Sequence, residues 1–121
     1  MTVTNTGLAE VANLLIGDGT AFGWIAIGTG TNNDDPELKT ALQTEVQRES
    51  ATTSRKASTG GVTNAAGEWV STFSFSGAVA VTEAGLLNAA TDGVLLARQV
   101  FSAVNMVDGD SLEVTISVDC E

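Results

Sequence analysis

Histidine and tyrosine are absent from this chain, which has one cysteine, one proline and only five basic residues. Without histidine, a Ser-His type of catalytic triad is excluded, and so are the commonest general base and a frequent transition-metal ligand. The single cysteine, Cys120, excludes an intrachain disulfide. We expect it to be a small buried residue, because it falls on the apolar side of the last predicted strand.

The second scarcity is positive charge. Fifteen acidic residues against five basic ones give a formal net charge of −10. Such a chain repels nucleic acid and anionic membranes, because affinity for phosphate depends on lysine and arginine. We therefore expect no direct binding to either. An ordinary acidic surface and adaptation to high salt both fit this balance, and the charge alone does not separate them.

Long apolar runs are also missing. No run approaches the ~18 residues that cross a bilayer, and Met1 does not open a basic and apolar leader. At 121 residues the chain is predicted to be one domain with a single core, burying roughly two-thirds of its unfolded surface. We expect a soluble product.

The strongest positive signal is β structure in residues 68–121, which we predict to be core strands. Thr82–Phe101 forms two apolar strands around Asp92-Gly93, a dipeptide suited to a tight hairpin because both residues accept positive φ. In Ser111–Glu121 apolar and polar residues alternate strictly, which is typical of a half-buried strand. Residues 69–76 alternate too, with Trp69, Phe73 and Phe75 on one side. The aromatic set could form a ligand platform, but aromatics are so scarce here that we interpret it as core: Trp24, Trp69, Phe73, Phe75 and Phe101.

Residues 1–45 predict a buried strand between two short helices. Residues 1–17 form an N-terminal helix that opens at Thr6 or Gly7 and closes at Gly17. Residues 22–29 are nearly all apolar and predict a strand buried on both faces. A second helix starts at Pro36 and runs to Leu42. The inner faces of the helices are predicted to be Leu8, Val11, Ala12 and Leu15, and then Leu38, Ala41 and Leu42.

Residues 46–60 are polar and predict an extended edge strand or an arm. The sum is about six strands and one or two short helices. The predicted fold is mainly β, an antiparallel β-sandwich or a barrel-like sheet.

Two segments together resemble structural proteins of tailed viruses of bacteria or archaea. IAIGTGTNNDDPELKTALQTEVQR, at residues 25–48, is similar to a pattern of tail-fibre and collar N-terminal domains, in which a Gly-Thr-Gly turn precedes a Thr-Ala-Leu helix and Glu-Val-x-Arg. VTEAGLLNAATDGVLLARQVFSAVNMVDGDSLEVTISV, at residues 81–118, resembles the later half of the same proteins. The resemblance covers about half of the chain in the expected order and implies a virion component. The compact length favours a stand-alone head decoration, or cement, protein.

Residues that could carry chemistry have plainer interpretations. Gly28-Thr29-Gly30 lacks the third glycine and the lysine of a phosphate-binding loop, so we interpret it as a turn. Residues 32–35 and 108–110 offer oxygen ligands for Ca²⁺ or Mg²⁺, but neither has the spacing of a calcium loop, and we interpret them as solvated loops and helix caps. We expect no catalytic, cofactor or metal site and no enzyme activity.

Charged pairs and a surplus of apolar residues indicate contacts instead. Glu45 and Arg48 are spaced for a weak surface pair on or just past a helix. We interpret Glu83 first as a residue at the start of a strand. The alternative is that Glu83 meets Arg48 or Arg98, across strands or subunits, as a charge-assisted clamp. Apolar residues at 8–16 exceed what one small helix needs, which predicts a subunit contact. The predicted interface set is Leu8, Val11, Leu15, Arg48, Arg55, Lys56, Glu83 and Arg98.

Two functions compete on this basis. The first is a capsid decoration protein, a homo-oligomer and on this role a trimer, which binds the major capsid protein or other virion proteins on the head surface and stabilises the shell by multivalent contacts. The second is a tail, collar, baseplate or tail-fibre adaptor. A small hydrolase or sugar-binding module is a third class, and it would show a pocket with a raised-pKa acid. For both virion roles the chain is made in the host cytoplasm.

Overall fold

The computed structural model describes residues 1–120, and over these residues the chain forms eight strands and one α-helix. In chain order the elements are β1 (Thr2–Val3), α1 (Asn5–Leu15), β2 (Trp24–Gly28), the 3₁₀ helix η1 (Pro36–Leu38), β3 (Glu45–Ser50), β4 (Thr52–Lys56), β5 (Ala66–Ser74), β6 (Val79–Leu87), β7 (Leu95–Met106) and β8 (Ser111–Asp119). The strands make two open antiparallel sheets. The predicted β-sandwich is confirmed.

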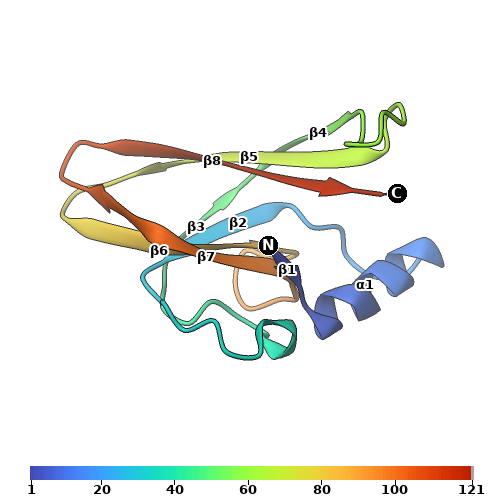
Figure 1. The fold of residues 1–121 in the computed structure, drawn as a ribbon, viewed down its shortest axis with the longest axis horizontal. Helices are drawn as coiled ribbons and strands as arrows, with labels where there is room; N and C mark the ends of the chain where they lie inside the picture. Colours follow the sequence, from blue (N-terminus) through green and yellow to red (C-terminus); the bar gives the residue numbers. More distant parts are fainter. Residues whose placement is uncertain (121) are drawn as a thin grey trace.

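The two sheets are stacked as two layers, and a loop covers the outer face of one of them. Sheet A has the strand order β1-β7-β6-β2-β3, and sheet B has the order β4-β5-β8. In Figure 1 sheet B lies above sheet A, and the long connection between β2 and β3 lies below it. Both faces of sheet A are therefore covered near its centre.

Each face of sheet A carries its own apolar cluster. The cluster between the sheets includes Ile25, Ile27 and Leu86 from sheet A and Phe73 and Ile116 from sheet B, all buried. The opposite face carries a smaller buried cluster, made of Ala26, Leu42, Leu87 and Leu95. This arrangement explains why β2 is apolar at successive positions, since a strand covered on both sides has no wet face.

The polar segment at residues 46–60 supplies the edges of both sheets. It forms β3 at the edge of sheet A and then β4 at the edge of sheet B. Ala51 lies between them, and its N–H donates to the Gly23 carbonyl at 2.8 Å. The Ser71 hydroxyl donates to the Ser50 carbonyl at 3.1 Å. Because these bonds hold the crossing, the segment stays on the sandwich as two edge strands.

Helix α1 begins earlier than the sequence predicts and turns a different face inward. Thr4 is its N-cap, and the Thr4 hydroxyl accepts the Gly7 N–H at 2.9 Å. A Cβ atom added at Gly7 would lie 2.7 Å from the Leu96 Cα, so only glycine lets the helix approach β7 this closely. Val11 and Leu14 follow Gly7 at helical spacing and pack against the core.

The predicted inner stripe of α1 was therefore wrong. Leu8, Ala12 and Leu15 face solvent, and only Val11 of the predicted set packs inward. The reason is that the helix has two adjacent apolar stripes at the same spacing. Hydrophobicity does not distinguish these stripes, whereas the close contact at Gly7 does.

The predicted second helix shrinks to the short η1. Asp35 has a φ of 47° before it, and Lys39 after it has extended backbone. Leu38 is 62% exposed, while Leu42 is buried. The N–H groups of Gln43 and Thr44, which a longer helix would use internally, donate instead to the Glu83 carboxylate.

The β6–β7 connection has the predicted positive φ values but is longer than a tight turn. Asp92 and Gly93 have φ of 52° and 77°. The strands, however, stop at Leu87 and resume at Leu95. The side chain of Asn88 accepts the Val94 N–H at 2.7 Å and closes the loop.

Strand β8 alternates as predicted, but Cys120 does not continue it. β8 ends at Asp119, and Cys120 is exposed. The Cys120 N–H donates to the Ala65 carbonyl, which belongs to the loop before β5. The expectation of a buried cysteine was wrong because the residue lies past the end of the β8 strand.

Candidate functional site

An ion pair is buried on the face of sheet A that the β2–β3 loop covers. Glu83 on β6 and Arg98 on β7 are 0% and 2% exposed. The Arg98 Nε donates to the Glu83 Oε1 at 2.8 Å. The β6–β7 register places Arg98 opposite Gly85, two positions from Glu83, and the two side chains meet diagonally on this face.

The Glu83 carboxylate also binds the backbone of the loop at both ends. Its Oε2 accepts the N–H groups of Gly30 at 2.7 Å and Thr44 at 2.8 Å, and its Oε1 accepts that of Gln43 at 2.9 Å. Arg98 reaches the same loop, because its Nη1 donates to the Asn32 carbonyl at 2.9 Å. The pair thus fastens both ends of residues 29–44 to the sheet.

Two glycines make room for this carboxylate. A Cβ at Gly28 would lie 2.6 Å from the Glu83 Oε2, and one at Gly30 would lie 2.5 Å from the same atom. The Thr82 hydroxyl donates to the Gly30 carbonyl at 2.8 Å and fixes the turn further. The Gly-Thr-Gly segment is therefore a turn, as the sequence predicted, and it packs around the buried Glu83 carboxylate.

Burial and hydrogen bonding act on Glu83 in opposite directions. Burial is the largest single influence and by itself raises the pKa of Glu83. The backbone N–H of Thr44, the Arg98 guanidinium and the N–H groups of Gln43 and Gly30 together outweigh it, so the pKa lies below its usual 4.5. Glu83 is accordingly charged at neutral pH, and its four donors satisfy it.

This arrangement is suited to holding a loop. Both carboxylate oxygens accept hydrogen bonds from fixed donors, and an Arg next to them compensates the charge. The Arg98 Nη2 is buried and has no hydrogen-bond partner among residues 1–120. The contacts give Glu83 and Arg98 a positioning role inside the subunit, and the pair lies across the neighbouring strands β6 and β7.

Arg48 takes part in a second, more exposed network. Its guanidinium pairs with Glu45, with Nη2 and Oε1 2.7 Å apart, and both residues lie on β3 instead of a helix. The Arg48 Nη1 also donates to the carbonyls of Ala89 and Asp92, at 2.8 and 2.9 Å. Arg98 is therefore the partner of Glu83, and Arg48 ties β3 to the β6–β7 connection.

The remaining predicted interface residues lie on two separate surfaces. Leu8 and Leu15 are exposed on α1, whereas Val11 is partly buried and packs against the core. Arg55 and Lys56 are exposed on β4, and the Lys56 Nζ lies 3.1 Å from a Glu68 carboxylate oxygen. The structure thus separates the helix surface from the basic strand.

The loops that offered oxygen ligands use them for local hydrogen bonds. The Asn32 side chain accepts the Asp34 N–H at 2.8 Å, and the Asp110 carboxylate accepts the Val107 N–H at 2.9 Å. Within residues 1–120, no three histidine, cysteine, aspartate or glutamate side chains gather in a way that could hold a metal ion. Over the same residues, no helix has the length and apolar character to cross a membrane.

Comparison with protein-family models, with curated proteins and with solved structures finds no match to this chain. Its function is therefore inferred from the contacts of its own residues.

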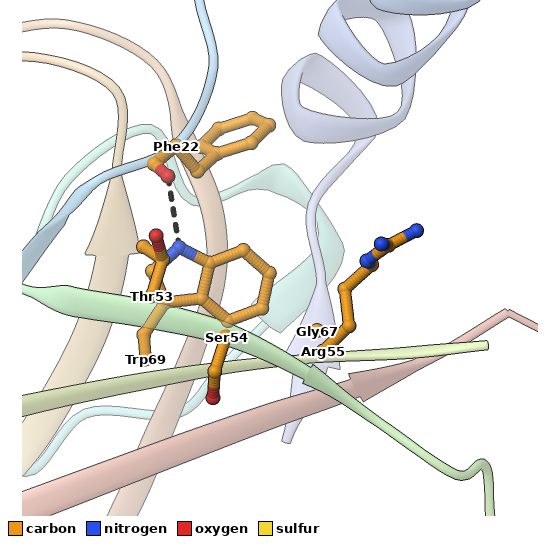
Figure 2. A pocket seen from close by; sticks show the side chains of 6 residues that line it. All are labelled: Phe22, Thr53, Ser54, Arg55, Gly67 and Trp69. Atoms are coloured by element: carbon orange, nitrogen blue, oxygen red, sulfur yellow. Dashed lines mark hydrogen bonds between the residues drawn. The ribbon is translucent and has the colours of Figure 1, made fainter. Parts of the chain in front are cut away.

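Sequence reasoning missed one surface feature. Phe73 and Phe75 are buried as predicted for core aromatics, but Trp69 is only half-buried and lines a hollow of about 420 Å³. Figure 2 shows Trp69 in this hollow between Phe22 and Arg55. The hollow draws on three segments that are distant in sequence, so no local pattern indicates it. The available signal is Gly67, two residues before Trp69 on the same strand.

Proposed function

We propose that this chain is a structural subunit of a tailed virus, a capsid decoration protein that works as a homo-oligomer, with a trimer as the expected form. The observation that carries the proposal is the outward face of α1. Leu8, Leu15 and Ile16 are 56%, 82% and 77% exposed there. Several exposed large apolar side chains on one short helix are typical of a contact site.

The position of α1 suits a contact with another subunit. In Figure 1 the helix lies at one end of the sandwich. Its inner side is held by the Thr4 cap and by the packing of Gly7 on Leu96, so its outer side is presented in a fixed orientation. Burying one leucine or isoleucine side chain contributes about 1.5 to 3 kcal/mol. A few such residues per copy, repeated over many sites, give strong total binding through avidity.

The internal ion pair supports the same role. Glu83 and Arg98 fasten residues 29–44, the long connection between β2 and β3, to sheet A. A rigid subunit loses little conformational entropy when it joins an assembly. The net charge of −10 adds repulsion between finished particles.

Analytical ultracentrifugation tests the oligomer directly. We expect the native chain to sediment as an oligomer and the double variant Leu15→Asp with Ile16→Asp to sediment as a folded monomer. Leu38→Asp is the matched control, because Leu38 is also an exposed leucine but lies on η1. A native chain that stays monomeric at high concentration contradicts the oligomer.

Imaging tests the virion role. Purified protein is added to shells that lack auxiliary proteins, and the particles are imaged by electron microscopy. Saturable density at symmetric positions on the head supports a decoration protein. Density confined to the tail supports the tail, collar or baseplate adaptor, and the absence of binding to any particle contradicts both.

A further inference from the structure

The hollow beside Trp69 has an ordered aromatic floor. It is lined by Phe22, Thr53, Ser54, Arg55, Gly67 and Trp69. The Trp69 Nε1 donates to the Phe22 carbonyl at 2.8 Å, which fixes the indole ring. A Cβ at Gly67 would lie 2.7 Å from the Trp69 Cη2. The indole ring therefore covers Gly67, and a larger residue at position 67 would displace the ring.

The free edge of sheet B borders this hollow. β4 is an edge strand with no partner on its outer side among the strands of residues 1–120. Its residues Thr53, Ser54 and Arg55 are consecutive, and successive side chains of a strand point to opposite faces. A hollow that touches all three residues borders the edge strand itself, whose outer backbone groups are available to another chain.

Arg55 supplies a positive charge at the same place. The strand register pairs Arg55 with Gly67 and Thr53 with Trp69, so these four residues share one face. In Figure 2 the Arg55 side chain extends from β4 toward the helix. Arg48, Lys56 and Arg98 each have a carboxylate partner, whereas Arg55 forms no ion pair with any of residues 1–120.

We propose that this hollow binds an extended acidic peptide segment of a partner protein. The peptide adds as a strand to the edge of β4, an apolar side chain packs on Trp69 and Phe22, and a carboxylate pairs with Arg55. The identification of the partner as a virion protein rests on the proposed function. The chemistry of the peptide follows from the hollow itself.

The charges of the chain favour a peptide over a nucleic acid. Nucleic-acid binding needs several lysine or arginine contacts to phosphate, and the net charge here is −10. A single unpaired arginine matches one carboxylate. The edge strand beside that arginine can pair its backbone N–H and C=O groups with those of a peptide, whereas a small free anion has no such groups.

Amide NMR of the full chain tests the proposal with a synthetic probe. The probe is a blocked hexapeptide in which a leucine and a glutamate stand two positions apart among serines, so that both side chains point to the face that Trp69 and Arg55 share. Its control is the same peptide with glutamine in place of glutamate. We expect the glutamate peptide to shift the Trp69 indole signal and the amide signals of β4. The Trp24 indole is an internal control, because Trp24 packs against the cluster on the other face of sheet A.

Two variants locate the charge. Arg55→Gln is expected to weaken peptide binding about tenfold, the loss typical of one charge-assisted contact. Lys56→Gln, on the same strand but paired with Glu68, is expected to bind as the native chain does. Equal binding of the glutamine peptide, equal binding by Arg55→Gln, or no shift at Trp69 overturns the proposal. A single-stranded oligonucleotide that shifts Trp69 as strongly as the peptide also overturns it.

The imaging experiment distinguishes this failure from failure of the proposed function. If the shells bind the native chain but the native chain does not bind the peptide, the virion role is retained and the peptide site is rejected. Peptide binding that depends on Arg55, without binding to any particle, retains the site and removes the virion role.

Discussion

The buried Glu83–Arg98 pair predicts a large loss of stability when only its acidic member is neutralised. Glu83→Gln keeps the size of the side chain but removes the charge that compensates Arg98. It also places an amide NH₂ among the N–H donors of Gly30, Gln43 and Thr44. Breaking a buried pair by removing one partner typically costs about 3 to 5 kcal/mol. For a domain of this size, 1 kcal/mol changes the melting temperature by about 4 °C, so we expect a decrease of about 12 to 20 °C.

The control is a pair of the same chemistry with a more exposed acid. Glu45→Gln removes the carboxylate partner of Arg48, and the Glu45 side chain is 31% exposed. Surface pairs contribute about 0 to 1 kcal/mol, because water screens the charges in both states. Urea unfolding at neutral pH measures both free energies of unfolding under the same conditions.

The reasoning is refuted if Glu83→Gln and Glu45→Gln cost the same. Hydrogen exchange offers a second measurement. The amides of Gly30, Gln43 and Thr44 are expected to lose protection in Glu83→Gln, while those of β5, in the other sheet, lose it only through the lower global stability.

Three further predictions follow from the same contacts. Gly30→Ala is expected to cost about 1 to 3 kcal/mol by urea unfolding, because its Cβ would press on the Glu83 Oε2, and a neutral substitution would contradict the geometry. The pKa of Glu83 is lower in the folded state than its usual 4.5, so its charge stabilises the fold fully above about pH 4.5, and this stabilisation is lost as the pH falls through the folded pKa. The difference in free energy of unfolding between the native chain and Glu83→Gln should therefore shrink in acid. A difference that stays constant down to acid unfolding would contradict this. Cys120 should react with a thiol reagent in the native state nearly as fast as in urea, and reaction only after unfolding would show that it is buried.

Much of the strand layout could be predicted because it depends on local patterns. β2 is apolar at successive positions because both of its faces are covered, and β8 alternates because only one of its faces is covered. The number of covered faces is therefore visible in neighbouring residues of the sequence. Positive φ at Asp92-Gly93 was predictable for the same reason, since it depends on the residue types themselves.

Elements decided by distant contacts could not be read in this way. The length of η1 depends on Glu83, forty residues away, which takes the N–H groups of Gln43 and Thr44 from a longer helix. The inward face of α1 depends on the fit of Gly7 against Leu96.

The amino-acid sequence by itself determined the β class, the acidic charge and the absence of histidine chemistry, because composition and short-range periodicity carry them. Only the tertiary structure decided that Arg98 is the partner of Glu83, that Arg48 serves another loop, and that Arg55 stands unpaired beside Trp69 among residues 1–120. The physical reason is that ion pairing and burial are properties of three-dimensional neighbourhoods. Arg98 and Arg55 have different roles because Arg98 lies under a loop and Arg55 lies on the edge strand of a sheet.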